Sequence, residues 1–187
     1  ITHHVKLPHL LAFSLQVSGM QSESLGNTDK DVFDNYGLVW IVTDYAIEID
    51  RLPRYNEKVT ITTEAISYNK IFCYRNFYIT DEAGQQIMLF KTTFALMDYE
   101  TRKVAEVPDE VVAPYGADKI KKLFRGPRYK TLENPLEILY RVRYFDLDMN
   151  GHVNNSKYLE WMLDVFDLDF LTEYTPVSYT HLTLPTN

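Results

Sequence analysis

The residues best suited to chemistry lie in one short stretch near the C-terminal end of the sequence, at Asp148, Asn150 and His152. From Asn154 onward the apolar spacing predicts a helix. The residues on one face of that helix are Leu159, Met162, Leu163 and Phe166. A strand, a polar elbow and a helix in this order bring the three polar side chains beside the unpaired N–H groups and positive dipole end of the helix. Such a position can hold a carbonyl oxygen while the oxygen gains negative charge.

The three side chains offer different chemistry. His152, with an unperturbed pKa near ~6.5, could act as a base or donate a hydrogen bond to a carbonyl oxygen. Asn150 does not titrate, and its amide would orient a water or the carbonyl. Asp148 would either activate the water or fix His152 by accepting its N–H. The alternative is that Asp148 and Asn150 only cap the turn and the helix. Purely structural roles, as elbow and cap, are expected for Asp146, Asn154 and Asn155.

The order Asp-x-Asp-x-Asn-Gly-His-Val-Asn-Asn-x-x-Tyr-Leu-x-Trp, residues 146–161, resembles the signature of the acyl-acyl carrier protein thioesterases. In that family two hot-dog domains lie in one chain. The stretches that resemble the first domain are Trp40-Ile-Val, Ile49-Asp-Arg-Leu-Pro-Arg-Tyr and Tyr99-Glu-Thr-Arg-Lys. The resemblance covers roughly residues 1 to 170. It implies hydrolysis of fatty acyl-acyl carrier protein thioesters without metal or organic cofactor, with catalytic roles for Asp148, Asn150 and His152 and a further acid beyond the end of this chain.

Two other functions remain open, an acyl-coenzyme A thioesterase of the same fold and a non-catalytic acyl-binding hot-dog domain. The first of these is usually a single domain, so an internal repeat disfavours it. A shift of 148 residues pairs His4 with His152 and Leu11 with Leu159, and both copies open a helix at the same place. The first copy has Thr2 where the second has Asn150. The chemistry is therefore expected in the second copy.

The elements that must position these residues follow from periodicity. The expected order is a helix over 7–25, a loop over 27–37, and strands from 38 and over about 58–67, 70–80 and 85–98. A helix followed by an antiparallel meander predicts an α+β domain of the hot-dog type, with the helix on one face of a curved sheet. Seven aromatic residues could line an acyl tunnel, although packing in the sheet core is the simpler role for each: Trp40, Tyr45, Phe72, Tyr74, Phe77, Phe90 and Phe94.

We expect a tandem arrangement with a nearly complete first domain and a truncated second one. Its parts are a first hot-dog domain over 1–115 whose N-terminal strand is missing, a linker over 116–136, the strand and helix of a second domain over 137–176, and a non-native tail over 177–187. The linker region carries a basic run, which is either a docking patch for acidic acyl carrier protein or a solvated connector. Its residues are Lys119, Lys121, Lys122, Arg125, Arg128 and Lys130.

Composition limits the remaining classes of function. The chain has 187 residues, of which 45% are hydrophobic, and its net charge of -7 argues against non-specific nucleic-acid binding. No apolar run approaches the ~20 residues of a membrane span. Cys73 is the single cysteine, so a disulfide framework and a cysteine zinc site are excluded. A cytoplasmic protein is expected, and an uncovered apolar face on the second helix would favour a homodimer.

Overall fold

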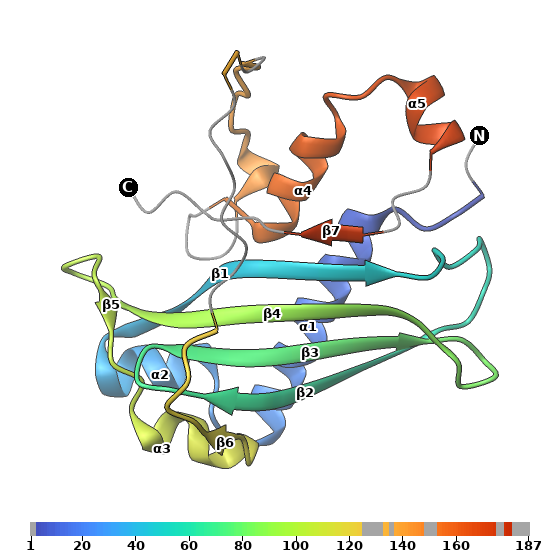
Figure 1. The fold of residues 1–187 in the computed structure, drawn as a ribbon. Coiled ribbons are helices and arrows are strands. Elements are labelled where there is room, and N and C mark those ends of the chain that lie inside the picture. The colour runs from blue at the N-terminus through green and yellow to red at the C-terminus, as the bar shows by residue number, and fades with distance from the viewer. Residues whose placement is uncertain (1–2, 125–132, 135–136, 148–152, 175–177, 181–187) are drawn as a thin grey trace.

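A curved antiparallel sheet lies against one long helix (Figure 1). The computed structural model describes residues 3–124, 133–134, 137–147, 153–174 and 178–180. The helix is α1 (Leu7–Ser24), and the long strands are β1 (Leu38–Ile49), β2 (Thr60–Tyr68), β3 (Phe72–Thr80) and β4 (Gln86–Asp98). Each strand and the helix fall close to where the periodicity predicts them. The α+β arrangement with the helix on one face is therefore confirmed.

The strand order differs from a simple meander. It runs β6-β2-β3-β4-β1-β7, with β5 (Val104–Ala105) beside β4, so that β1 pairs with β4 and lies far from β2. The connection from β1 to β2 passes the turn between β3 and β4, where Arg51 donates hydrogen bonds to Glu57 at 2.7 and 2.9 Å and to Asp81 at 3.0 Å. This ion-pair cluster ties the connection to the turn. The turn itself has Gly84 at φ 78°, in the left-handed region that favours glycine.

The expected loop over 27–37 is wrong, because a second helix, α2 (Asp29–Tyr36), forms there. Thr28 caps it: the Thr28 Oγ1 accepts from the N–H of Asp31 at 3.1 Å, and the Asp31 carboxylate accepts from the N–H of Thr28 at 2.8 Å. Gly37 ends the helix in the left-handed region at φ 66°. Only Val32 of this helix is buried, which explains why no apolar period is visible in the sequence.

Two apolar clusters hold the structure. The larger lies between α1 and the sheet, and its largest fully buried side chains are Tyr45, Ile47, Phe77, Phe90 and Leu11. The smaller cluster lies under α2 and α3 (Asp109–Val112), with η1 (Ala113–Tyr115) following, and includes Val32, Leu96, Val107 and Val111. The first residues of the expected linker continue against this domain, since β6 (Asp118–Lys119) pairs with β2 in parallel.

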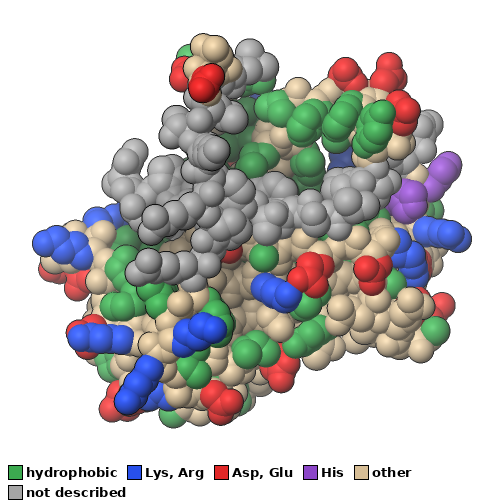
Figure 2. Space-filling model, in the orientation of Figure 1, with side chains coloured by type: hydrophobic (Ala, Val, Ile, Leu, Met, Phe, Trp, Pro, Cys, Tyr) green, Lys and Arg blue, Asp and Glu red, His purple; other side chains and the backbone are tan. Residues whose placement is uncertain are grey.

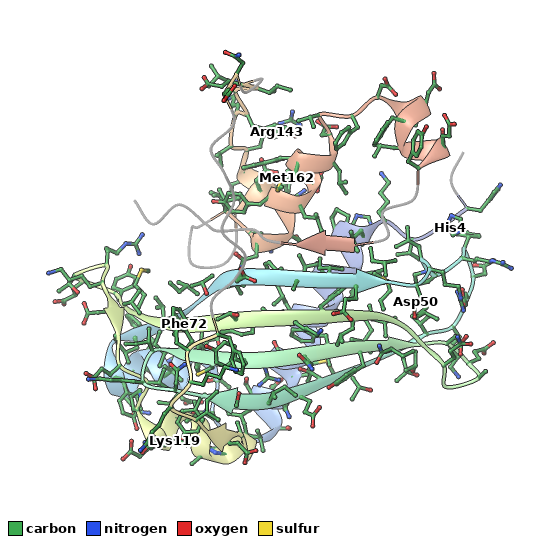
Figure 3. The ribbon with its side chains drawn as sticks, viewed as in Figure 1. His4, Asp50, Phe72, Lys119, Arg143 and Met162 are labelled. Atoms are coloured by element: carbon green, nitrogen blue, oxygen red, sulfur yellow. The ribbon has the colours of Figure 1, made fainter. Side chains whose placement is uncertain are left out.

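The C-terminal part packs beside α1 through α4 (Asn155–Leu163). Helices α1 and α4 begin at residues 7 and 155, which differ by the 148 residues of the repeat, and Leu11 and Leu159 enter the same core. An uncovered helix face is therefore the wrong expectation for Leu159, which is 2% exposed, and for Leu163, which packs on that core. Met162, labelled in Figure 3, remains 41% exposed.

The second domain has a different local structure from the one expected. The described residues 137–147 contain no strand: η2 (Tyr144–Asp146) forms there, and Leu147 makes an isolated bridge. After α4 come α5 (Leu168–Glu173) and β7 (Ser178–Thr180), which pairs with β1. Figure 2 shows hydrophobic side chains gathered over α4 and α5, and the exposed ones include Phe166, Leu168 and Phe170. Within the described part of the chain, no helix is long and apolar enough to cross a membrane.

Candidate functional site

The predicted catalytic residues Asp148, Asn150 and His152 lie outside the described residues, but the structure describes both ends of their segment. Leu147 and Val153 form an isolated antiparallel bridge. In addition, the N–H of Asn154 donates to the carbonyl oxygen of Asp146 at 2.7 Å. The two ends of the segment over 148–152 therefore lie side by side, directly ahead of α4.

Two flanking residues hold this elbow, in agreement with the structural roles expected for them. The buried carboxylate of Asp146 accepts a hydrogen bond from the N–H of Arg143 at 2.8 Å. Asn154 is the N-cap of α4, where its side-chain oxygen accepts from the N–H of Ser156 at 3.0 Å and from its hydroxyl at 2.9 Å. The first turn of α4 is thus fixed immediately after the motif.

A cavity of about 220 Å³ lies between α1 and the sheet. Its α1 wall consists of Leu15, Ser18, Gly19 and Ser22, and its sheet wall includes Val42, Cys73 and Phe94. Asn155, the first residue of α4, also lines the cavity. The sequence reading assigned Asn155 only a capping role together with Asn154. Its position connects the elbow that carries the motif to the cavity.

The aromatic series divides between cavity and core. Trp40, Tyr74 and Phe94 line the cavity, and the rings of Trp40 and Phe94 meet edge to face at 6.2 Å. In contrast, Tyr45, Phe77 and Phe90 are fully buried in the closed core, and Phe72 is half-buried at the start of β3. Part of the series therefore lines a cavity and part packs in the core, and an acyl chain in that cavity stays a prediction. The cavity therefore has a mixed lining, in which apolar and aromatic side chains lie beside serines, the Asp29 carboxyl and the Arg75 guanidinium.

Burial dominates the electrostatics of the cavity. Burial raises the pKa of the Cys73 thiol to about 12 and raises the pKa of the Asp29 carboxyl. It lowers the pKa of Arg75, a lining residue that the sequence reading missed. Arg75 Nη1 donates to Gln21 Oε1 at 2.6 Å and to Thr63 Oγ1 at 2.7 Å, and its guanidinium carbon lies 5.2 Å from the ring centre of Tyr115. The available signal was a charged residue at an inward position of β3.

Comparison with family models gives two consecutive matches. The acyl-ACP thioesterase N-terminal domain matches residues 1–115, and the acyl-ACP thioesterase C-terminal domain matches residues 129–181. The chain belongs to the acyl-ACP thioesterase family. The resemblance stated from the motif is confirmed, and the order of the two matches agrees with two related domains in one acyl-ACP thioesterase chain.

Curated acyl-ACP thioesterases show moderate similarity. The chloroplastic acyl-[acyl-carrier-protein] hydrolase FATB3 of Cuphea viscosissima is 28% identical over 78% of this chain and 37% of its own length. The chloroplastic palmitoyl-acyl carrier protein thioesterase of Arabidopsis thaliana is 26% identical over 80% of this chain and 38% of its own. The chain thus spans less than half the length of these relatives.

Solved structures confirm the fold. A protein assigned as an oleoyl thioesterase from Lactobacillus plantarum is 36% identical, with a TM-score of 0.87 over 94% of this chain and 70% of that one. An acyl-ACP thioesterase from Bacteroides thetaiotaomicron is 25% identical, with a TM-score of 0.78 over 91% of this chain and 69% of that one. The 12:0-ACP thioesterase from Umbellularia californica, at 20% identity, has a TM-score of 0.77 over 95% and 74% and supports the fold alone.

The basic run of the predicted patch is partly described. Lys119 forms an ion pair with Asp109 at 2.7 Å, and Lys122 lies 5.0 Å from the ring centre of Phe124. Arg125, Arg128 and Lys130 lie outside the described residues. Figure 3 shows Lys119 and Arg143 at opposite ends of the molecule, so this part of the run is remote from the elbow.

Proposed function

We propose that this protein acts in the hydrolysis of fatty acyl-acyl carrier protein thioesters, which releases free fatty acid and ends fatty-acid elongation. Membership of the acyl-ACP thioesterase family supports this reaction. The observation that carries the proposal is the cavity between α1 and the sheet, which Asn155 reaches only three residues after His152. An acyl chain would lie in the cavity, with its thioester at the elbow ahead of α4.

The proposed mechanism uses the start of α4 and the three motif residues. The positive dipole end of α4 and the Asn150 amide polarise the thioester carbonyl. His152, held by Asp148, takes a proton from water as the water oxygen attacks the carbonyl carbon. The carbon–sulfur bond then breaks, and the leaving thiolate recovers the proton from His152. No metal or organic cofactor takes part in this scheme.

The catalytic assignment is tested by measuring turnover of a saturated fatty acyl chain linked as a thioester to acyl carrier protein. His152→Ala should reduce turnover by about 10²-fold or more, as expected when a base or a carbonyl donor is removed. Asn150→Asp keeps the size of the side chain but removes the amide donor, and should also be impaired. His9→Ala, at an exposed position on α1, is the matched control and should turn over normally. Near-normal activity of His152→Ala would refute the assignment.

The proposed partner is acyl carrier protein, and the basic run is its candidate docking patch. Because Lys119 is already paired with Asp109, the patch rests on Lys121 and Lys122 among the described residues. Reversing both charges should raise KM for the carrier-linked substrate, with a smaller effect at high salt and little effect on a coenzyme A thioester. Lys103→Glu, an exposed control on another turn, should leave KM unchanged. An equal rise in KM for both substrates would contradict docking of acyl carrier protein on this run. Unchanged KM for both would show that the run is a solvated connector.

Assembly and setting stay predictions. The exposed apolar side chains of α4 and α5, such as Met162 and Phe170, would favour a homodimer, which light scattering tests. Expression in the cytoplasm is the setting expected from the sequence, whereas the curated plant relatives carry the word chloroplastic in their names. The domain limits, including the tail over 177–187, likewise stay predictions.

A further inference from the structure

A row of polar side chains crosses the sheet beneath α1, at one boundary of the cavity. Tyr45 on β1 faces Thr92 on β4, and Thr92 faces Arg75 on β3. Their exposed fractions are only 1%, 2% and 9%. On one side of this row, the next inward-facing residues on the same three strands line the cavity: Val42, Phe94 and Cys73. On the other side, the next inward-facing residues on these strands are buried in the closed core: Ile47, Phe90 and Phe77. The polar row therefore separates the cavity from the core.

Arg75 carries a charge that the described residues do not balance. Its hydrogen bonds go to the neutral side chains of Gln21 and Thr63, both from Nη1, and its guanidinium lies over the neutral ring of Tyr115. None of the described carboxylates forms an ion pair with it. A guanidinium has five N–H donors, and a buried charge is costly unless it is paired. Asp29 is the other charged lining residue, and burial alone raises its pKa, so it lacks the effect of a nearby cation.

Two neighbouring hydroxyls strengthen this observation. Among the described residues, Tyr45 Oη and Thr92 Oγ1 are buried without a hydrogen-bond partner. Buried polar groups in proteins nearly always have a partner, and an unmade bond is destabilising. The same row thus holds an unbalanced cation and two unsatisfied hydroxyls. Of this row only Arg75 lines the cavity, and a methyl end of a saturated chain could not satisfy its guanidinium.

We propose that the cavity selects acyl chains with an oxygen-bearing group, a hydroxyl or a carboxylate, toward the end remote from the thioester, and that Arg75 determines this specificity. The inference rests on the proposed function, which places the thioester at the start of α4. Helix α4 lies next to β7, at the β1 side of the sheet (Figure 1), and Arg75 is on β3, two strands from β1. With strands ~4.8 Å apart, a chain that enters near β1 reaches Arg75 after roughly 10 Å. An acceptor oxygen there would receive the remaining N–H groups of the guanidinium.

The test measures binding by calorimetry with three pantetheine ligands of equal chain length. In each, CH₂ replaces the thioester sulfur to give a ketone that cannot be hydrolysed, and the chain ends in a methyl, a hydroxyl or a carboxylate. The wild-type protein should bind the two oxygen-tipped ligands at least about tenfold more tightly than the methyl-tipped one, because the added hydrogen bonds involve a charged donor. This comparison needs no variant to fold.

Variants then assign the preference to Arg75. Arg75→Met should reduce the preference to within about twofold, and Arg75→Lys, which keeps the charge, should retain part of it for the carboxylate. Arg54→Met removes an exposed guanidinium and should leave the preference intact. Equal or tighter binding of the methyl-tipped ligand by the wild-type protein would overturn this inference and leave the proposed function standing. Failure to bind any of the three ligands would count against the proposed function as well.

Discussion

Gly19 offers a test in which stability and ligand binding should move in opposite directions. It lies in the interior of α1 and lines the cavity. Glycine in a helix interior is about 0.8–1 kcal/mol less favourable than alanine. A Cβ added at Gly19 meets no atom within 4 Å, so alanine there would enter open space. Gly19→Ala should therefore raise the free energy of unfolding by about 1 kcal/mol, and Tm by roughly 2–4 °C for a chain of this size.

A larger side chain at the same position should keep the helix gain but fill the cavity. Gly19→Leu would displace part of a bound acyl chain, and each methylene kept out of an apolar site costs about 0.8 kcal/mol. Loss of two methylene contacts would then weaken binding by about 1.6 kcal/mol, which is slightly more than tenfold in Kd. The variant should be at least as stable as the wild type and bind acyl ligands worse.

The assay combines urea unfolding with calorimetric binding of the ketone ligand that the wild-type protein binds best. Gly37→Ala is the matched control, because Gly37 ends α2 at φ 66° and a Cβ there also meets open space. That variant should lose roughly 1–2 kcal/mol through backbone strain alone. Undiminished binding by Gly19→Leu would refute the placement of an acyl chain beneath α1. Destabilisation by Gly19→Ala would instead contradict the open space around a Cβ at this position.

Three further outcomes follow from packing and ionisation. Leu159→Ala should lower the free energy of unfolding by about 2–5 kcal/mol, whereas Met162→Ala on the exposed side should cost less than about 1 kcal/mol, as urea titrations can compare. Hydrogen bonds from Arg51 hold the pKa of Glu57 at about 2, so the stabilisation they give is complete above about pH 4.5 and is lost as pH falls toward 2. Glu57→Gln should therefore make the free energy of unfolding depend less on pH in this range. The same pH dependence in the variant and the wild type would contradict this. Cys73 should alkylate slowly at neutral pH, faster as pH rises toward about 12, and more slowly still with an acyl ligand bound; mass spectrometry follows this single thiol, and rapid neutral labelling would exclude its buried position.

The sequence predicts most of the fold because its helices and strands follow from the spacing of apolar residues. The helical spacing over residues 7–25 and the alternating β1 residues are local signals, and both elements form at the expected places. The buried face of α1 is less well predicted, because Leu10 of the helically spaced apolar residues is buried whereas Phe13 and Met20 are 53% and 61% exposed. The order of the strands is not local. Whether β1 pairs with β2 or with β4 depends on how the connection around Arg51 crosses the sheet, and no spacing in the sequence encodes that path.

The cavity could be predicted only in part, for a related reason. Phe90 and Phe94 lie on the same strand and face the same side of the sheet, yet Phe90 belongs to the closed core and Phe94 lines the cavity. The difference arises from where α1 crosses the sheet, which is a tertiary property. Arg75 was missed because an isolated arginine in a strand normally lies at a surface. Its inward position follows from its alternation with Phe77 and Ile79 on β3, but its hydrogen bonds to Gln21 and Thr63 depend on tertiary contacts that the sequence does not show.

The two copies of the repeat contribute different parts of one proposed site. Helix α1 of the first copy covers the cavity, while the second copy carries the motif immediately ahead of α4. The contact between α1 and α4, anchored by Leu159, therefore couples binding to chemistry. A substitution that loosens this contact, such as Leu159→Ala, should lower turnover even though Leu159 neither lines the cavity nor belongs to the proposed catalytic set. Because the acyl chain would still bind beneath α1, the loss should appear in kcat more than in ligand affinity.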